Sequence, residues 1–177
     1  NYAPVISTNA GLWRYLPGDT IAFTALNPYR IRVTGRTRHY INAFGEELIV
    51  DNADEAIQHA CRQTNAVVQE YTAAPLYLTE TGRGGHEWLI EFAQLPPNLP
   101  EFVQQLDAKL KSINSDYEAK RFNNLAMQLP VVTPVTEGTF YRWLQSKGKL
   151  GGQHKVPRLA NDRQYIDEIK QFAGSAG

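Results

Sequence analysis

The sequence changes its pattern near residue 40, and no other feature constrains the fold as much. In the first forty residues, short apolar runs are cut by turn signals such as Pro17-Gly18-Asp19 and Asn27-Pro28. After them, apolar residues recur at helical spacing in some segments and form short strand-like runs in others. The expected fold class is therefore α+β, with a small antiparallel β unit ahead of a domain of helices and strands.

The β unit is predicted from two runs on either side of the Asn27-Pro28 turn. Residues 20–26 alternate partly between apolar and polar side chains. In residues 30–34, Ile31 and Val33 share one face and the arginines between them lie on the other. Two such runs joined by a tight turn are typical of an antiparallel pair.

The rest of the chain predicts helix, strand, strand, helix, followed by a further strand and C-terminal helices around a small antiparallel sheet. The helices are expected at residues 52–64, 100–113, 116–121, 136–144 and 162–172, and the strands at residues 67–78, 87–93 and 129–135. We expect Asn52, Thr136 and Asp162 to cap three of the helices, because a side-chain oxygen there can accept from an unpaired helix amide.

Composition narrows the class of function. The 177 residues include 18 Lys plus Arg and 18 Asp plus Glu, and this balance argues against a protein that coats nucleic acid or an anionic membrane. No apolar run is long enough to span a bilayer, and the first residues show no signal-peptide pattern. Cys61 is the single cysteine, and no Cys/His cluster has zinc spacing, so no metal site is expected. We expect a soluble, cytoplasmic protein.

The first stretch that could carry chemistry is residues 11–19, an aromatic-rich run that ends in a Gly18-Asp19 turn. A strand followed by such a turn would hold the Asp19 carboxylate in a fixed place, where it could accept hydrogen bonds from two vicinal hydroxyls. The alternative is that Asp19 only satisfies amides of its own turn, and turn chemistry is common enough to favour this reading when the stretch is taken alone.

The second stretch is residues 33–47, where Gly35 and Gly45 bracket a basic segment between the β unit and the α+β domain. A junction with few apolar contacts could act as a hinge. Arg36 could reach a phosphate or a ribose with its planar donor fork. An ordinary solvated basic loop explains the pattern equally well.

The third stretch is residues 148–158, a glycine-rich loop that ends in Lys155. Pro157 favours an extended conformation at Val156, so Lys155 would project from a stiffened segment toward a phosphate or carboxylate oxygen. The Walker pattern is absent. Without further context, a flexible surface turn is the favoured interpretation.

Other chemistry-bearing residues have structural interpretations. The acidic side chains at the start of the first predicted helix suit the positive end of its dipole; they are Asp51, Asp54 and Glu55. The three tryptophans lie in periodic segments and are expected to anchor the core; they are Trp13, Trp88 and Trp143.

Taken in order, these stretches resemble a known family. The Arg-Tyr-x-x-Gly-Asp element at residues 14–19 and the element at residues 35–45 look like two motifs near the domain junction of adenylate-forming enzymes, which include acyl-CoA synthetases, adenylation domains and luciferase. Residues 41–48, 138–140 and 153–158 are similar to one branch, the auxin-responsive-promoter (Gretchen Hagen) family of acyl-acid amido synthetases, particularly its bacterial members. The resemblance runs over nearly the whole chain.

The resemblance implies a two-step reaction. A carboxylic acid attacks the α-phosphate of ATP to give an acyl adenylate and pyrophosphate, and an amine, usually an amino acid, then displaces AMP to form an amide. Mg²⁺ would accompany ATP, bound mainly by the phosphates and by residues outside this chain.

The resemblance also implies roles for individual residues. Lys155 would stabilise the charge around the α-phosphate during adenylation. Asp19 would hold the ribose hydroxyls, Arg36 and Tyr15 would complete the nucleotide contacts, and Arg38 falls at the hinge. The commoner lysine motif of the superfamily, Pro-Lys-Thr-x-x-Gly-Lys, is absent, so Lys155 is assigned on the pattern of the narrower branch.

On this resemblance, residues 1–38 are the tail of a large N-terminal domain and residues 39–177 are the C-terminal lid. The chain would then be a part of an enzyme and inactive by itself. Two alternatives stay open: a free-standing ferredoxin-like module that binds RNA or a protein, and a regulatory relative that has lost catalysis. The zero net charge argues against RNA, and the presence of Asp19, Arg36 and Lys155 argues against the regulatory relative.

Overall fold

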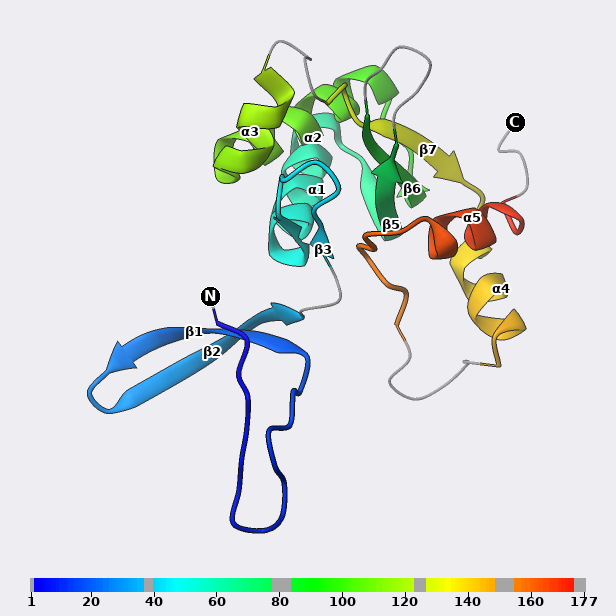
Figure 1. Ribbon diagram of the computed structural model, residues 1–177. Coiled ribbons are helices and arrows are strands. Elements are labelled where there is room, and N and C mark those ends of the chain that lie inside the picture. Colours follow the sequence, from blue (N-terminus) through cyan, green and yellow to red (C-terminus); the bar gives the residue numbers. More distant parts are fainter. Residues whose placement is uncertain (1, 37–39, 78–83, 123–126, 149–154, 174–177) are drawn as a thin grey trace.

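The computed structural model describes residues 2–36, 40–77, 84–122, 127–148 and 155–173 (Figure 1). Two parts are visible. A β hairpin with a long preceding loop projects to one side, and an α/β body contains the remaining helices and strands (Figure 1). The expected α+β class is confirmed.

The hairpin consists of β1 (Asp19–Leu26) and β2 (Tyr29–Arg36). The strands are antiparallel, and their register pairs Leu26 with Tyr29 next to the turn and Asp19 with Arg36 at the open end. The loop before β1 contacts the hairpin through an isolated bridge from Tyr2 to Ile21, and a second bridge, from Ile6 to Tyr15, joins two parts of the loop itself. The antiparallel unit predicted around the Asn27-Pro28 turn is therefore present.

The body is built on a three-stranded sheet in the order β5 (Val67–Leu76), β6 (Gly85–Gln94) and β7 (Val131–Val135). β5 and β6 are antiparallel, but β7 runs parallel to β6. The expectation of an antiparallel sheet is therefore wrong for this strand. Two helices lie between β6 and β7 in the chain, and a connection of this length lets β7 enter the sheet in the direction of β6.

Helices cover both faces of the sheet, and one hydrophobic core lies on each face. The first core joins α1 (Val50–Thr64), α2 (Leu99–Ile113) and α3 (Ser115–Arg121) to Trp88 and Ile90 of β6. The second core joins α4 (Thr139–Ser146) and α5 (Gln164–Lys170) to Leu89 of β6 and Val135 of β7. Successive β6 side chains therefore enter opposite cores, as the two-residue period of a strand requires.

The three expected helix caps all differ from the structure. Asn52 lies inside the first turn of α1, where its Oδ1 accepts a hydrogen bond from the Ile49 amide at 3.4 Å. The helix begins earlier because residues 48–49 form the short strand β4 (Leu48–Ile49), which pairs with β3 (Tyr40–Ile41) and leads directly into it.

The start of α4 receives its cap from the sheet instead of from Thr136. The buried Glu91 carboxylate of β6 accepts from the amides of Gly138 at 2.8 Å and Phe140 at 3.3 Å. The positive end of the helix therefore faces a carboxylate supplied by tertiary structure. The expectation that Asp162 caps the last helix is also wrong: the N-cap of α5 is Arg163, and Asp162, one residue earlier, accepts from the Gln164 amide at 2.9 Å.

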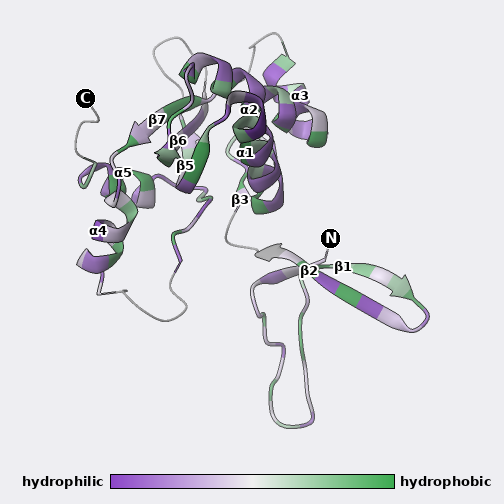
Figure 2. Ribbon diagram, turned by 180° about the vertical axis from the view of Figure 1, so that it is seen from behind, coloured by the Kyte–Doolittle hydropathy of each residue, from purple (hydrophilic) through white to green (hydrophobic). Residues whose placement is uncertain are grey.

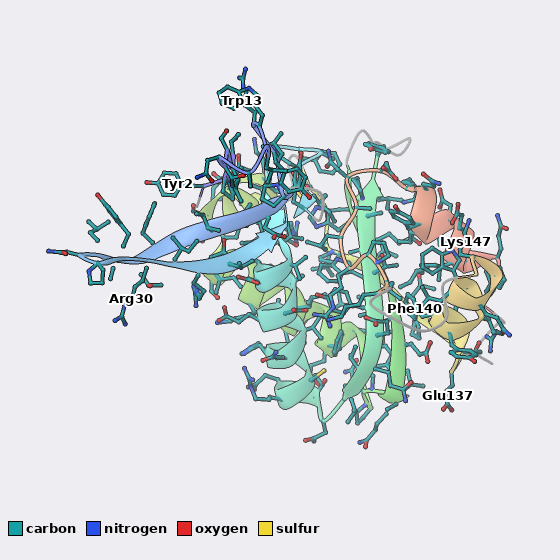
Figure 3. The ribbon with its side chains drawn as sticks, turned by 90° about the horizontal axis from the view of Figure 1, so that it is seen from below. Tyr2, Trp13, Arg30, Glu137, Phe140 and Lys147 are labelled. Carbon is teal, nitrogen blue, oxygen red and sulfur yellow. The ribbon has the colours of Figure 1, made fainter. Side chains whose placement is uncertain are left out.

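The three tryptophans differ from one another. Trp88 and Trp143 are 0% and 2% exposed and anchor the two cores, but Trp13 is 79% exposed. Figure 3 shows Trp13 pointing away from the molecule at the tip of its segment. The expectation that Trp13 anchors the core is wrong, because the N-terminal part of the chain has almost no interior of its own.

No helix among the residues that the structure describes combines the length and the apolar character needed to cross a bilayer.

Candidate functional site: the hairpin end, the junction and the lysine segment

Two of the predicted nucleotide-binding residues meet at the open end of the hairpin. Asp19 and Arg36 are direct partners in the strand register, and the Asp19 side chain is half-buried. Gly18 precedes Asp19 with a φ of +80°, a conformation that L side chains rarely adopt. The glycine therefore permits the turn that places Asp19 at this position. Only the backbone of Arg36 is described.

Tyr15 lies on the loop before β1 and not on the hairpin itself. Its amide and carbonyl exchange two hydrogen bonds with Ile6, each 2.8 Å long, and its side chain is exposed. The predicted hinge residue Arg38 lies outside the described residues.

The junction motif begins with β3 and ends inside the body. Its Glu46 carboxylate is fully buried, with Oε1 2.8 Å from Nε2 of His86 on β6 and Oε2 accepting from the Phe44 amide at 2.7 Å. Burial alone would raise the pKa of Glu46, but the hydrogen bond and the electrostatic attraction of His86, with nearby backbone amides, lower that pKa overall. The junction is therefore locked to the sheet by a buried polar pair that the sequence did not single out.

Two further contacts hold the junction in place. Asn114, at the start of α3, donates from Nδ2 to the Glu46 carbonyl at 3.0 Å and accepts from the Tyr117 amide at 2.8 Å. The Phe44 ring lies over Gly84, where an added Cβ would be 2.2 Å from the ring. Gly84 is thus required for this close approach, and the residues that follow β3 pack against the body.

The segment that begins with Lys155 adds to the outer edge of β5. Thr72 Oγ1 donates to the Pro157 carbonyl at 2.7 Å, and the Ala73 amide donates to the Arg158 carbonyl at 2.8 Å. Val156 is buried in the second core, whereas Lys155 is exposed. The exposed ammonium group therefore stands at the start of a segment whose next residues are fixed.

The Arg158 side chain reaches from this segment across to α1. Its Nη1 lies 2.7 Å and 2.6 Å from the two carboxylate oxygens of Asp54, and its guanidinium lies over the Tyr71 ring, 5.4 Å from the centroid. Burial would lower the pKa of Arg158, but the charge of Asp54 and the neighbouring Tyr71 and Glu70 raise it overall. These side chains line a groove of about 410 Å³ between α1 and β5.

This contact corrects one interpretation of the acidic residues. Asp51 lies in the first turn of α1, as expected of a charge that favours the helix dipole. Asp54 instead pairs with Arg158, and Glu55 pairs with Lys109 of α2 at 2.8 Å. Both lie beyond the first turn, where tertiary ion pairing replaces the dipole.

The junction and the lysine segment meet although they are far apart in the sequence. The Asn42 amide donates to Asn161 Oδ1 at 2.8 Å, and the Tyr77 hydroxyl donates to the Asn161 carbonyl at 3.1 Å. In Figures 1 and 2 the segment descends from the body on the side where the hairpin joins it. The junction stretch therefore contacts the segment that begins with Lys155 at Asn161, just beyond the end of the third stretch.

Among the residues that the structure describes, no three His, Cys, Asp or Glu side chains gather in a way that could hold a metal ion.

The structure thus has two parts, an α/β body and a separate hairpin that precedes it, and the lysine segment is fixed beside the junction between them. We compared this chain with known protein families. Residues 51–164 match the GH3 family C-terminal domain, and residues 1–36 match the GH3 family central domain. The first match covers more than half of the chain. The chain therefore belongs to the GH3 family.

Solved structures share the fold. The structure described as "GH3.15 acyl acid amido synthetase" matches with a TM-score of 0.77 and 19% identity over 98% of this chain and 33% of its own. A second, "AtGH3.15 acyl acid amido synthetase in complex with 2,4-DB", matches with a TM-score of 0.73, the same identity and the same coverage. The chain thus spans about a third of the length of these structures. A comparison with curated protein sequences returned no match.

Proposed function

We propose that this chain is the C-terminal lid portion of an ATP-dependent acyl-acid amido synthetase of the adenylate-forming superfamily, bacterial in type. The intact enzyme adenylates a carboxylic acid and transfers the acyl group to an amine, usually an amino acid, releasing AMP. Membership in the GH3 family supports the class of enzyme. The observation that carries the proposal is the exposed Lys155 at the start of a segment fixed to the sheet and to the junction.

Adenylation is the step that needs a cation at this place. A carboxylate oxygen forms a bond to the α-phosphorus while the bond to the pyrophosphate oxygen breaks, and negative charge gathers on the phosphoryl oxygens. In a closed site with little water, the Lys155 ammonium would stabilise that charge more than it does in the substrate. In the second step, the amine attacks the acyl carbon and AMP leaves with the electron pair of the acyl–oxygen bond.

The hairpin end supplies the proposed nucleotide contacts. Asp19 would accept hydrogen bonds from the two ribose hydroxyls, and Arg36, opposite it in the register, would contact the ribose or phosphate. Tyr15 would add a further contact from the preceding loop. Mg²⁺ would neutralise phosphate charge when it is bound with ATP, and its ligands would come from the phosphates and from the rest of the enzyme, since the described residues offer no group of three His, Cys, Asp or Glu side chains for it.

We assign residues 1–38 to the tail of the large N-terminal domain and residues 39–177 to the lid, with Arg38 at the hinge. The match of residues 1–36 to the family's central domain is in accord with this division. The acyl pocket and most of the ATP site would then belong to the rest of the enzyme. We predict that this chain alone is inactive, that it works with the remaining N-terminal domain in the cytoplasm, and that it binds neither nucleic acid nor membrane.

The test is carboxylic-acid-dependent ATP–pyrophosphate exchange by the intact polypeptide. Lys155→Ala is expected to lower exchange by about 10²- to 10³-fold, the loss typical when a preorganised charge-stabilising group is removed. Lys147→Ala is the matched control: this lysine at the end of α4 pairs with Glu168 at 3.0 Å and has no proposed role in the reaction. Unchanged exchange in a folded Lys155→Ala variant would refute the role of Lys155.

The length of the native polypeptide separates this proposal from the open alternative. An immunoblot against this segment should detect a product much longer than 177 residues. A product of the same length would contradict the lid assignment and would make RNA or protein binding the first activity to measure.

A further inference from the structure

The Lys155 segment is attached to the body most closely at Arg158, three residues further on. The Arg158 carbonyl accepts from the Ala73 amide, and its side chain holds both carboxylate oxygens of Asp54. Three residues of extended chain span about 10 Å at most. Any shift of Arg158 is therefore passed almost directly to Lys155, since Val156 is buried and Pro157 has a fixed φ.

We propose that Asp54 and Tyr71 are positioning residues for adenylation, because they hold Arg158 and through it fix the place of the Lys155 ammonium. This inference rests on the proposed function. It adds a link between α1, β5 and the lysine segment that was not evident from the sequence, where Asp54 and Arg158 are 104 residues apart.

The geometry of the three side chains suits this role. Tyr71 donates its hydroxyl to Asp54 Oδ1 at 2.5 Å, so the carboxylate is held by one partner while it holds another. The guanidinium is confined from the side by the Tyr71 ring, whose face attracts a cation. The planar fork of arginine allows both contacts together, which the compact ammonium of a lysine would not.

The pKa of Tyr71 is consistent with a hydroxyl that stays protonated and donates. Burial, followed by the hydrogen bond to Asp54 and the charge of that carboxylate, raises the pKa of Tyr71 far above its ordinary value. The hydroxyl therefore keeps its proton throughout the working range of an enzyme.

The two half-reactions distinguish positioning from a loss of folded protein. Bonds to the α-phosphorus change only in adenylation, so a displaced Lys155 should slow that step and leave aminolysis of a preformed acyl adenylate unchanged. In the intact polypeptide, Asp54→Asn is expected to lower kcat for ATP–pyrophosphate exchange about 10- to 100-fold, as misplacing a group by about 1 Å does. Tyr71→Phe, which removes only the hydroxyl, is expected to have a smaller effect of the same kind.

Glu55→Gln provides the matched control. Glu55 is the next residue on α1 and loses an ion pair to Lys109, but this pair does not contact the lysine segment. Both half-reactions of Glu55→Gln should stay within about twofold of the unaltered enzyme, because exposed pairs contribute little to stability.

A double variant completes the test. If Asp54 acts through Lys155, Asp54→Asn should cause no further loss of exchange in a Lys155→Ala background. If Lys155→Ala alone leaves exchange unchanged, the proposed function fails at that residue. Suppose instead that Lys155→Ala abolishes exchange. If Asp54→Asn then leaves exchange intact, or if Asp54→Asn lowers the rates of both half-reactions equally, only the positioning inference is overturned.

Discussion

The hairpin region and the α/β body both carry regularly placed apolar residues, but those of the hairpin are exposed and those of the body are buried. In β2, Ile31 and Val33 alternate with arginines, yet they are 57% and 63% exposed. In the body, Trp88, Ile90 and Phe102 are completely buried. Figure 2 shows hydrophobic and hydrophilic residues alternating along β2.

An alternating sequence pattern thus predicts that one face of a strand is apolar, but it does not predict which part of the protein packs on that face. The hairpin and its preceding loop expose many large apolar side chains, namely Tyr2, Val5, Trp13, Tyr15, Leu16, Phe23, Leu26, Tyr29, Ile31 and Val33. An apolar surface of this extent marks an interaction site. The apolar residues of the body are covered within the chain, and under the proposed function the rest of the central domain would cover the hairpin.

The largest expected contrast is between two phenylalanines. Phe102→Ala, in the first core, should lower the free energy of unfolding of this chain by about 3–5 kcal/mol, through lost burial and the cavity left behind. Phe23→Ala, in the exposed hairpin, should lower it by less than about 0.5 kcal/mol. Urea unfolding followed by circular dichroism would measure both. Equal losses would show that the hairpin shares the core of the body.

A second contrast concerns charge inside the body. Asp107 of α2 binds Arg121 of α3 at 2.6 Å, and both are buried. Asp107→Asn should lower the free energy of unfolding at pH 7 by about 3 kcal/mol, because Arg121 would lose its charged partner. The exposed Glu118→Gln on α3 should change it by less than about 0.5 kcal/mol.

The pH dependence of this contrast follows from the pKa of Asp107. Burial would raise that pKa, but Arg121, Lys111 and Tyr117 lower it overall. A carboxyl whose pKa is lower in the folded state contributes stability above its unfolded pKa, near about 4, and loses it as the pH falls through the folded value. The difference between the Asp107→Asn variant and the unaltered chain should therefore shrink below about pH 4. A difference that stays constant to pH 2 would contradict the role of the ionised carboxylate.

The order and type of the elements were largely predictable because they depend on local pattern. The apolar stripe of α2 is buried at Phe102, Leu106 and Leu110 as its helical spacing indicates. The direction of β7 was not predictable, because it depends on how the helices before it pack. The exposure of Trp13 was not predictable either, because it depends on tertiary packing: the segment around Trp13 lies outside both cores of the body.

The candidate site was predictable only in its local parts. The Asn27-Pro28 turn sets the register that pairs Asp19 with Arg36, and Pro157 indicates the extended segment after Lys155. The contacts that fix these parts join distant residues. Arg158 and Asp54 are 104 residues apart in the sequence, and His86 and Glu46 are 40 residues apart. No local sequence pattern predicts either contact.

The central claim is that the α/β body folds by itself, whereas the hairpin packs against the rest of the enzyme. Amide hydrogen exchange tests this claim most directly. We would compare the amides of β1 and β2 in this isolated chain and in the intact polypeptide. We predict that the hairpin amides exchange rapidly in the isolated chain and become protected in the intact polypeptide, while those of β5 and β6 are equally protected in both. Equal protection of the hairpin in the two would contradict the account.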